Sequence, residues 1–586
     1  MKKMILSWFV VMAAMLSWPW TASLDAREHK LYVVTTGDVH GAWFNRNYID
    51  GAPDRTSLMS VKYYVDSLRT AVGRDNVLLI DAGDCLQGDN ATYYFNYVDT
   101  LGKHLFPRIV SYMGYDAIVV GNHDVETGHA VYDKVTAELR DEGIPFLGAN
   151  AVRTTDGEPY FPAYKIFRRA GMKVAVLGFT NANMKAWLSE DVWSGMDFRS
   201  LVPCVQEWVD RVIAEHKPDV VIAAVHSGTG KGDGRVLENQ GLDLLYSLRG
   251  VDLVVSAHDH APYAVEHNGS ALLNSGAKAG NVGYAEITAD KRFGGLRSKR
   301  TCARVVRMDK SKVDEEMVAH FDSEYRMVRE FTNKRVGTLA MDMRTRDAYK
   351  GMSDYINLVH TVQISVPEAQ ISFAAPLTFD GTVKSGELVF NDMFTIYPYE
   401  NQMFVVKMTG REIKDYLEYS YDTWIQTPGD HILRIKPSAD ARTGTSRWSF
   451  VGRSYNFDSA AGLVYTVDVT KPAGKRVNIK SLAGGGTFDL DAWYNVAMTS
   501  YRANGGGELM PEGAGIKDIE SEGRVVVRYP ELRDMIYNYI LKVGELNKSN
   551  TGDEKILGEW HFIPEDIVGP MMDADMKLLF EARLSL

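Results

Sequence analysis

Short apolar runs, separated by longer amphipathic stretches, dominate the first half of the chain from about residue 29 to residue 310. Each run has four to six residues and is rich in Val, Ile or Leu; the runs are residues 31–36, 77–81, 117–120, 174–178, 220–225 and 252–256. Continuous runs of this length suit strands that are buried on both faces of a sheet. The stretches between them are long enough for crossover helices, so the pattern predicts an α/β domain over residues 29–310.

The pattern changes beyond residue 336, where Gly-rich turns at residues 484–486 and 505–507 accompany scattered aromatic side chains. We expect a second, α+β domain over residues 336–547. The charged stretch before it, residues 311–335, has apolar positions near helical spacing and predicts a helix. This helix either connects the two domains or closes the first, and the pattern alone fits both. Residues 548–586 form a C-terminal tail to which the pattern assigns no structure.

The N-terminus has the composition of a targeting segment. Lys2 and Lys3 precede an apolar run over residues 4–16, and small residues follow at 21–26. This is the order of a secretory signal peptide, so we expect residues 1–25 to be removed and the protein to be exported, to a periplasm, a cell surface or the medium. An N-terminal membrane anchor is the alternative. Later apolar stretches fall short of the roughly 18 residues of a spanning helix, so we expect no transmembrane span in the mature chain.

Composition narrows the range of partners. The 586 residues are 45% hydrophobic and 24% charged, which is typical of a folded soluble protein. Lys and Arg total 65 against 76 Asp and Glu, a formal charge of −11. Phosphate contacts of a duplex need a basic surface, so we expect no binding of duplex nucleic acid. A small anionic substrate stays possible, because a metal ion can meet its charge locally. Three Cys residues are too few for a disulfide framework.

Side chains that bind metals follow five of the apolar runs, usually beside a Gly. The carboxyl ends of strands in an α/β sheet form the rim where ligands bind. A single Asp-x-His or Gly-Asn-His could be a hydrogen-bonded turn. Five strand ends that together supply four His, two Asp and one Asn are improbable by chance. These residues are Asp38, His40, Asp84, Asn122, His226, His258 and His260.

This donor set predicts a pair of divalent metal ions. Carboxylate, imidazole and amide oxygen suit Mn²⁺, Zn²⁺, Fe or Mg²⁺ better than a soft thiolate site would. Two ions about 3.5–4 Å apart need a shared carboxylate, and one Asp can serve. A water or hydroxide between such ions is a nucleophile at neutral pH, and the ions neutralise a phosphate in its transition state.

The same motifs resemble those of the calcineurin-like dinuclear metallophosphoesterases, whose pattern is D-x-H, G-D, G-N-H-[DE], H and G-H-x-H. The resemblance covers the first half and implies a four-layer α/β/β/α sandwich. It also implies ligand assignments: Asp38, His40 and His260 hold one metal, Asn122, His226 and His258 hold the other, and Asp84 bridges them. One departure is Ala257, which stands before His258 where the family has Gly. We expect it to leave the ligands intact.

His123 is not a ligand according to this resemblance. It contacts the phosphate and either stabilises charge on it or assists the leaving oxygen. In the nucleotidase branch of the family this His is usually paired with an Asp three residues later. The position holds Glu126 here, and we expect Glu126 to orient His123 through a longer side chain.

The second half resembles the C-terminal domain of the 5′-nucleotidase family, in which two aromatic side chains stack on the faces of the nucleobase. The matching positions are Tyr399, in Tyr397-Pro398-Tyr399, and Tyr501, in Ser500-Tyr501-Arg502. From the residues alone, aromatic side chains beside Gly-rich turns can sandwich a base, but core or surface packing is the favoured interpretation.

One segment separates the subfamilies. Typical 5′-nucleotidases carry N-G-G-G-I-R, whose Asn and Arg bind substrate, whereas residues 372–377 read Ser-Phe-Ala-Ala-Pro-Leu. This segment and the two Tyr resemble the periplasmic 2′,3′-cyclic-nucleotide 2′-phosphodiesterase/3′-nucleotidases. We therefore expect an exported nucleotide phosphohydrolase of that type, acting through metal-bound hydroxide. A 5′-nucleotidase or UDP-sugar hydrolase, a sulfur-compound hydrolase and a catalytically silent secreted binding protein are the alternatives; the complete ligand set argues against the last.

Overall fold

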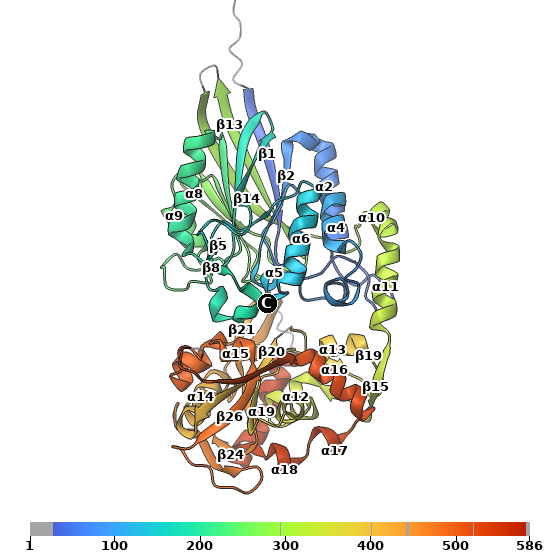
Figure 1. Cartoon of the computed structure of the whole chain (residues 1–586), viewed down its shortest axis with the longest axis vertical. Helices are drawn as coiled ribbons and strands as arrows, with labels where there is room; N and C mark the ends of the chain where they lie inside the picture. The colour runs from blue at the N-terminus through green and yellow to red at the C-terminus, as the bar shows by residue number, and fades with distance from the viewer. Residues whose placement is uncertain (1–26, 293–294, 400, 441–444, 520, 582–586) are drawn as a thin grey trace, which may run out of the picture.

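The computed structural model of the chain describes residues 27–292, 295–399, 401–440, 445–519 and 521–581. The expected signal peptide, residues 1–25, lies outside the described residues. Two domains follow one another along the chain and stack end to end (Figure 1). Within the described ranges, no helix is both long enough and apolar enough to cross a membrane.

Two six-stranded sheets form the centre of the first domain. The strand order of the first sheet is β14-β13-β1-β2-β3-β4, and that of the second is β11-β12-β10-β9-β7-β6. Strands β1 to β4 run parallel to one another, as do β7, β9, β10 and β12. The strands are β1 (Arg27–Thr36), β2 (Val77–Asp81), β3 (Ala117–Val119), β4 (Phe146–Leu147), β6 (Tyr164–Arg169), β7 (Met172–Phe179), β9 (Val220–Val225), β10 (Leu253–Ser256), β11 (Tyr263–His267), β12 (Ser270–Asn274), β13 (Asn281–Arg292) and β14 (Gly295–Arg307).

Side chains of the central strands are buried on both faces, which explains the continuous apolar runs. On β2, Leu78 and Ile80 pack in the layer between the two sheets, whereas Val77 and Leu79 pack beneath helices. Fully burying such side chains contributes about 1.5–3 kcal/mol each. Helices α2 (Leu58–Val72), α4 (Leu105–Met113) and α6 (His129–Asp141) lie on one side of the domain, and α8 (Leu201–His216) and α9 (Gly241–Ser247) on the other (Figure 1). The four-layer α/β/β/α sandwich is confirmed.

Two short helices lead from the first domain to the second. Helix α10 (Glu315–His320) and helix α11 (Asp322–Thr332) meet at Phe321, so the stretch predicted as one helix is divided. The Asp314 carboxylate accepts a hydrogen bond from the Met317 backbone N–H at 2.7 Å and caps the start of α10. Met317, Phe321 and Tyr325 pack into the core of the first domain, and the chain then enters β15 (Arg335–Leu339).

A five-stranded sheet with the order β23-β17-β26-β20-β27 forms the centre of the second domain. Its central helix, α14 (Gly410–Trp424), starts with a reciprocal cap in which the Glu412 carboxylate accepts from the Thr409 N–H and the Thr409 hydroxyl accepts from the Glu412 N–H. The strands are β17 (Ile371–Ala374), β20 (Gln402–Thr409), β23 (Ser459–Ala461), β26 (Trp493–Thr499) and β27 (Val525–Glu531). This α+β domain carries the aromatic segments of the second half.

The segment after residue 547 is integral to the second domain. Strand β29 (Trp560–Ile563) pairs in parallel with β24 (Leu463–Asp468), and helix α19 (Glu565–Phe580) follows it. Trp560, Phe562 and Met572 are buried in the same core as Trp424. The tail that the sequence pattern left unassigned therefore completes this core.

The domains touch through the short helix α3 (Asn90–Tyr93) of the first domain. Tyr93 lies against Phe390 and Phe394 of helix α13 (Phe390–Ile396), and its hydroxyl donates to the Asp534 carboxylate at 2.9 Å. The Asn90 amide donates to the Asn391 side-chain oxygen at 2.7 Å. Helix α3 follows Asp84 in the same connection after β2. The contact therefore links the second domain to the segment that carries a predicted metal ligand.

Candidate metal centre

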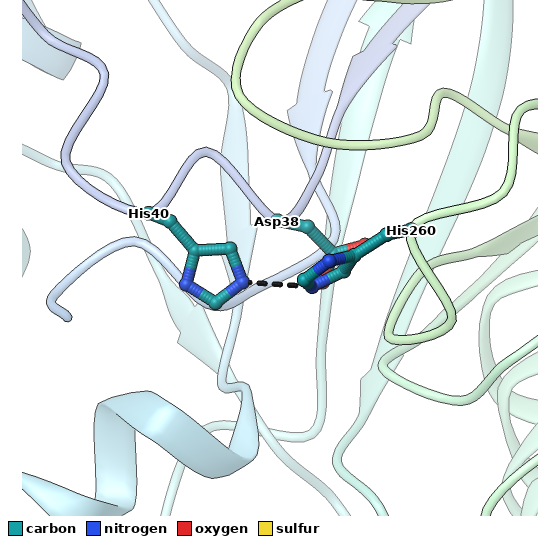
Figure 2. Close-up of side chains that lie close together, drawn as sticks. All are labelled: Asp38, His40 and His260. Carbon is teal, nitrogen blue, oxygen red and sulfur yellow. Dashed lines mark hydrogen bonds and ion pairs between the residues drawn. The ribbon is translucent and has the colours of Figure 1, made fainter. Parts of the chain in front are cut away.

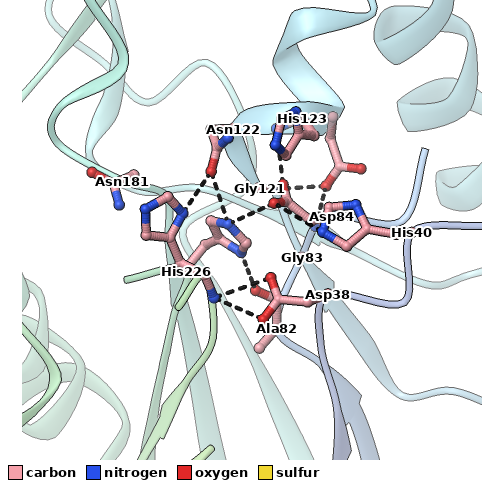
Figure 3. A network of polar contacts seen from close by, with 12 residues as sticks. Asp38, His40, Ala82, Gly83, Asp84, Gly121, Asn122, His123, Asn181 and His226 are labelled. Carbon is pink, nitrogen blue, oxygen red and sulfur yellow. Dashed lines mark hydrogen bonds and ion pairs between the residues drawn. The ribbon is translucent and has the colours of Figure 1, made fainter. Parts of the chain in front are cut away.

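The seven predicted ligands lie together at the carboxyl ends of the parallel strands. Asp38 and His40 follow β1, Asp84 follows β2, and Asn122 begins helix α5 (Asn122–Glu126) after β3. From the second sheet, His226 follows β9, and His258 and His260 follow β10. Because both sheets end at the same edge, residues more than 200 positions apart in the chain face one another (Figure 3).

Their side chains form two groups of potential ligands. Asp38, His40 and His260 bring one ligand atom each within 4.8 Å of one another (Figure 2), and Asp84, His226 and His258 do the same. Asn122 Oδ1 belongs to the second group, because it lies 3.0 Å from His226 Nε2 and 2.9 Å from His258 Nδ1.

Asp84 stands between the two groups. Its Oδ2 lies 3.1 Å from His226 Nε2 and 4.0 Å from His40 Nε2, so the one carboxylate approaches an imidazole of each group. The side chain is 1% exposed. The residue therefore has the position that a shared carboxylate needs.

Two of the imidazoles are oriented by backbone carbonyls. His40 Nδ1 lies 3.0 Å from the Gln87 carbonyl, and His226 Nδ1 lies 2.8 Å from the Ala82 carbonyl. A carbonyl oxygen only accepts, so Nδ1 carries the proton and the Nε2 lone pair faces the group. His40 Nε2 and His260 Nε2 lie 2.9 Å apart. Lone pairs and carboxylates converging in this way fit a divalent cation.

Strained backbone accompanies five of the seven predicted ligands. Asp38, His40, Asp84, His258 and His260 have φ values between 46° and 78°, in the left-handed region. Each such conformation costs a non-Gly residue of order 1–3 kcal/mol and persists only where its surroundings enforce it. Strain concentrated on the ligands is typical of a functional site.

Small residues beside the ligands are required by close packing. A Cβ added to Gly121 would lie 2.1 Å from Asp84 Oδ1, and one added to Gly83 would lie 2.7 Å from His226 Nδ1. Ala257, where the family has Gly, is fully buried with its Cβ facing Gly37, and the next N–H, that of His258, donates to the Asp38 carboxylate at 2.8 Å. The extra methyl group is therefore accommodated beside Gly37.

Asp124 is a supporting residue that the sequence did not single out. Its carboxylate accepts four backbone N–H groups, from Asp84, Cys85, Leu86 and Gly121, at 2.8–3.0 Å. Burial and the nearby Asp84 raise the pKa of Asp124 to about 6. The carboxylate holds the loop after β2 against the start of α5, and thereby fixes Asp84 relative to Asn122.

His123 lies beside the two ligand groups rather than within either. Its backbone N–H donates to Asp84 Oδ1 at 2.8 Å, and its Nδ1 contacts the Glu126 carboxylate one turn further along α5. Burial disfavours the charged ring, but Asp84 and Glu126 outweigh it and raise the pKa of His123 to about 9. Because Glu126 occupies Nδ1, the Nε2–H of the ring is available to a ligand.

Tyr399 and Tyr501 of the second domain lie near acidic side chains of the first domain. Burial raises the pKa of Tyr399 to about 12, and Tyr455 and the Glu126 carboxylate add to the rise, which places Tyr399 near both. Burial also raises the pKa of Tyr501 against the opposing Arg502, with Tyr455 and Glu238 adding to the rise. Within the described part of the chain no ring-to-ring contact joins Tyr399 to Tyr501. The two rings are neighbours that do not stack on each other.

Arg502 and Asp458 tie the aromatic segments together. The Arg502 guanidinium donates to both carboxylate oxygens of Asp458, at 3.0 and 2.8 Å, and to the Tyr455 carbonyl at 3.0 Å. Both charged side chains are under 5% exposed, so the pair is structural and fixes Tyr455 beside Tyr501. The structure thus adds Tyr455 as a third aromatic side chain near Tyr399 and Tyr501.

The segment over residues 372–377 is largely buried in the core of the second domain. Ser372, Phe373 and Ala374 lie on β17 and are buried. The Phe373 ring stacks on Tyr416 with centroids 4.2 Å apart, and Ser372 Oγ lies 2.8 Å from His360 Nδ1. This segment therefore supplies no cationic side chain for a substrate.

The fold and the ligand arrangement define a phosphoesterase of the calcineurin-like class. The model of the calcineurin-like phosphoesterase family matches residues 31–262, and the model of the 5′-nucleotidase C-terminal domain matches residues 333–512. The chain therefore contains a calcineurin-like phosphoesterase domain followed by a 5′-nucleotidase C-terminal domain. It is accordingly a metal-dependent hydrolase of phosphoric esters.

Similar proteins extend over most of the chain at low identity. The 2′,3′-cyclic-nucleotide 2′-phosphodiesterase/3′-nucleotidase of Salmonella typhimurium is 23% identical, covering 83% of both chains. The trifunctional nucleotide phosphoesterase protein YfkN of Bacillus subtilis is 24% identical over 88% of this chain, which spans 38% of that protein's length. The solved structure of a candidate 5′-nucleotidase from Staphylococcus aureus has 18% identity, covers 91% of this chain and 99% of its own, and gives a TM-score of 0.73.

Proposed function

We propose that the protein is an exported nucleotide phosphohydrolase that uses two divalent metal ions, with the specificity of a 2′,3′-cyclic-nucleotide 2′-phosphodiesterase/3′-nucleotidase. The observation that carries the proposal is the pair of ligand groups that share Asp84, with Tyr399 close enough to Glu126, and Tyr501 to Glu238, for the charges to affect them. Asp38, His40 and His260 would hold one ion, Asn122, His226 and His258 the other. Export rests on residues 1–25 and is tested by sequencing the N-terminus of the mature protein.

The chain's own residues have separable roles in this proposal. Bound divalent ions supply Lewis acidity, which activates water and neutralises phosphate charge. His123 Nε2–H, held in place by Glu126 on Nδ1, donates to a phosphate or leaving oxygen. Asp124 fixes the Asp84 loop. Tyr399 and Tyr501 bind the base on its two faces, and the distance between base and metal site then selects which phosphate is cleaved.

The preference for cyclic and 3′-phosphates rests on the second domain. Both candidate stacking residues are Tyr, and residues 372–377 lack the substrate-binding Asn and Arg that the resemblance assigns to typical 5′-nucleotidases. The Salmonella relative carries this activity in its name. The fold relative from Staphylococcus aureus bears the 5′-nucleotidase name, so 5′-nucleotidase activity is the competing assignment.

A substrate panel tests the assignment. With Mn²⁺ present, we expect phosphate release from 3′-AMP and ring opening of 2′,3′-cyclic AMP with kcat/KM at least about tenfold above that for 5′-AMP or UDP-glucose, a difference of ~1.4 kcal/mol in transition-state binding. Chelation of the metal should abolish all of these activities. Preference for 5′-AMP would refute the subfamily assignment, and inactivity on every nucleotide would refute the substrate class.

Replacing Tyr399 with Ala tests whether this ring stacks on the nucleobase. Stacking of one base on an aromatic ring is worth about 1–3 kcal/mol, so we expect KM for 3′-AMP to rise about 5- to 150-fold with a smaller change in kcat. Tyr399→Phe keeps the ring and should stay within about threefold of wild type. Glycerol 2-phosphate has no base and should be hydrolysed equally by all three proteins. An unchanged KM for 3′-AMP in Tyr399→Ala would exclude Tyr399 from base binding.

A further inference from the structure

His258 is the ligand whose ring is held by two side chains from loops. The indole of Trp187 stacks on the imidazole, with centroids 5.1 Å apart and planes inclined by 20°. At the ring edge opposite Asn122, the Glu238 carboxylate lies 4.0 Å from His258 Nε2, while Nδ1 faces Asn122 Oδ1. Nδ1 thus faces the predicted metal ligands, whereas Nε2 faces the Glu238 carboxylate. Carbonyls hold His40 and His226 in the corresponding way.

The backbone of Glu238 is anchored to the strand end that carries His226. Its carbonyl oxygen accepts hydrogen bonds from Gly228 N–H at 3.0 Å, Ser227 Oγ at 2.9 Å and Asn181 Nδ2 at 3.1 Å. The carboxylate itself accepts from Asn239 Nδ2 at 3.2 Å. Three contacts on one carbonyl fix the position of Glu238 in the loop of residues 226–240, which is Gly-rich over residues 228–234.

The Trp187 segment continues directly into a contact with the second domain. Two residues after Trp187, Ser189 Oγ donates to Gln402 Oε1 at 3.1 Å, and Gln402 Nε2 donates to the Asp191 carboxylate at 3.1 Å. Gln402 is the first residue of β20, three positions after Tyr399. A short run of the first domain therefore touches the His258 ring at one end and the strand behind the base site at the other.

We propose that Glu238 and Trp187 are positioning residues for the metal ligand His258, and that Gln402 fastens the Trp187 segment to the second domain, so that domain contact and metal binding support each other. The carboxylate, 4.0 Å from Nε2, favours a proton on that nitrogen through its charge and so leaves Nδ1 free to ligate, and the indole sets the plane of the ring. The inference rests on the proposed metal site and extends it to residues that follow no strand end.

Metal titration of Glu238 variants tests the first part without relying on activity. Loss of a carboxylate behind a ligating His typically costs 10–100-fold in metal affinity, so Glu238→Ala should raise the Kd for Mn²⁺ of one site by about that factor. Glu238→Gln keeps an acceptor and should lose less. Asp233→Ala is the matched control, since Asp233 lies in the same loop with similar exposure, 42% against 40%, and it contacts Arg235 within that loop.

The titration separates this inference from the proposed function. If wild type binds Mn²⁺ and Glu238→Ala binds it equally well, the inference is overturned while the function stands. Equal losses in Glu238→Ala and Asp233→Ala would also overturn it, because the loop as a whole would then be responsible. If wild type bound no metal ion, the proposed function itself would fail. Unchanged thermal unfolding of the metal-free variants confirms that they fold.

Trp187 and Gln402 variants test the link to the second domain. We expect Trp187→Ala to need about 10-fold more Mn²⁺ for half-maximal activity and to recover kcat at saturating Mn²⁺, whereas Trp187→Phe keeps the stacked ring and stays close to wild type. Gln402→Ala should raise the Mn²⁺ Kd in the same direction. The double variant should lose less than the product of the two single effects, because both act through one segment. An unchanged Mn²⁺ Kd in Gln402→Ala would overturn the link.

Discussion

Replacing Asp84 with Ala is expected to lower kcat/KM for nucleotides by at least about 10³-fold and to reduce the bound metal below one ion per chain. The Asp84 carboxylate lies 3.1 Å from His226 Nε2 and 4.0 Å from His40 Nε2, so its loss removes a ligand from both groups at once. A shared carboxylate supports a metal pair that stabilises the transition state by several kcal/mol, which corresponds to about three orders of magnitude. The measurements are elemental analysis of the purified protein and kcat/KM with Mn²⁺.

Asp84→Asn is the matched control for this prediction. It keeps the shape of the side chain and an oxygen that can accept the His123 N–H, but it loses the negative charge that balances two cations. We expect it to retain one ion more readily than Asp84→Ala and to stay far below wild type in kcat/KM. Two bound ions and wild-type kcat/KM in Asp84→Ala would show that the two groups do not depend on Asp84.

The strand runs and their terminal ligands could be predicted because both are local. A parallel strand buried on two faces gives an unbroken apolar run such as β2 or β9, and the residue that follows it lies at the rim by geometry alone. Asp38, Asp84 and His226 each follow such a run. The structure brings these rim residues together as expected. The pattern alone predicted an α/β domain, whereas the four-layer arrangement of its sheets and helices was implied by the family resemblance.

The sequence pattern could not identify residues that act through long-range contacts. Trp187 and Glu238 lie in loops 71 and 20 positions before His258, and neither follows an apolar run or a motif. Asp124 stands inside the recognised motif, but its four backbone partners appear only when the loops after β2 and β3 meet. Strand β29 has four residues, and its partner β24 lies about 95 positions earlier, so no local signal indicates the pairing.

The division of the connecting stretch at Phe321 has a physical cause that a helical pattern does not reveal. The Phe321 ring is 1% exposed and packs with Tyr112 in the first domain, with centroids 5.5 Å apart. Its backbone, at φ −104° and ψ 17°, lies outside helical values. Burial of this one ring turns the chain between α10 and α11, and apolar positions continue at near-helical spacing on both sides. Tertiary packing therefore decides the break.

Replacing His123 with Ala is expected to reduce kcat for 3′-AMP by about 10²–10⁴-fold while metal content stays at the wild-type level. The ring lies beside the ligand groups without belonging to either, and Glu126 on Nδ1 orients it. Burial lowers the pKa of His123, but Asp84 and Glu126 together raise it to about 9, so Nε2 is protonated at neutral pH. Glu126→Gln weakens that orientation and should reduce kcat less than His123→Ala does.

A comparison of two substrates distinguishes the two roles that the Nε2 proton of His123 can have. An aryl phosphate whose phenolate leaves without protonation should be hydrolysed by His123→Ala with a much smaller loss than 3′-AMP if Nε2–H assists the leaving oxygen, and with an equal loss if it stabilises the phosphate. Wild-type kcat on both substrates would remove His123 from the mechanism, and a loss of bound metal would instead make it a support for Asp84.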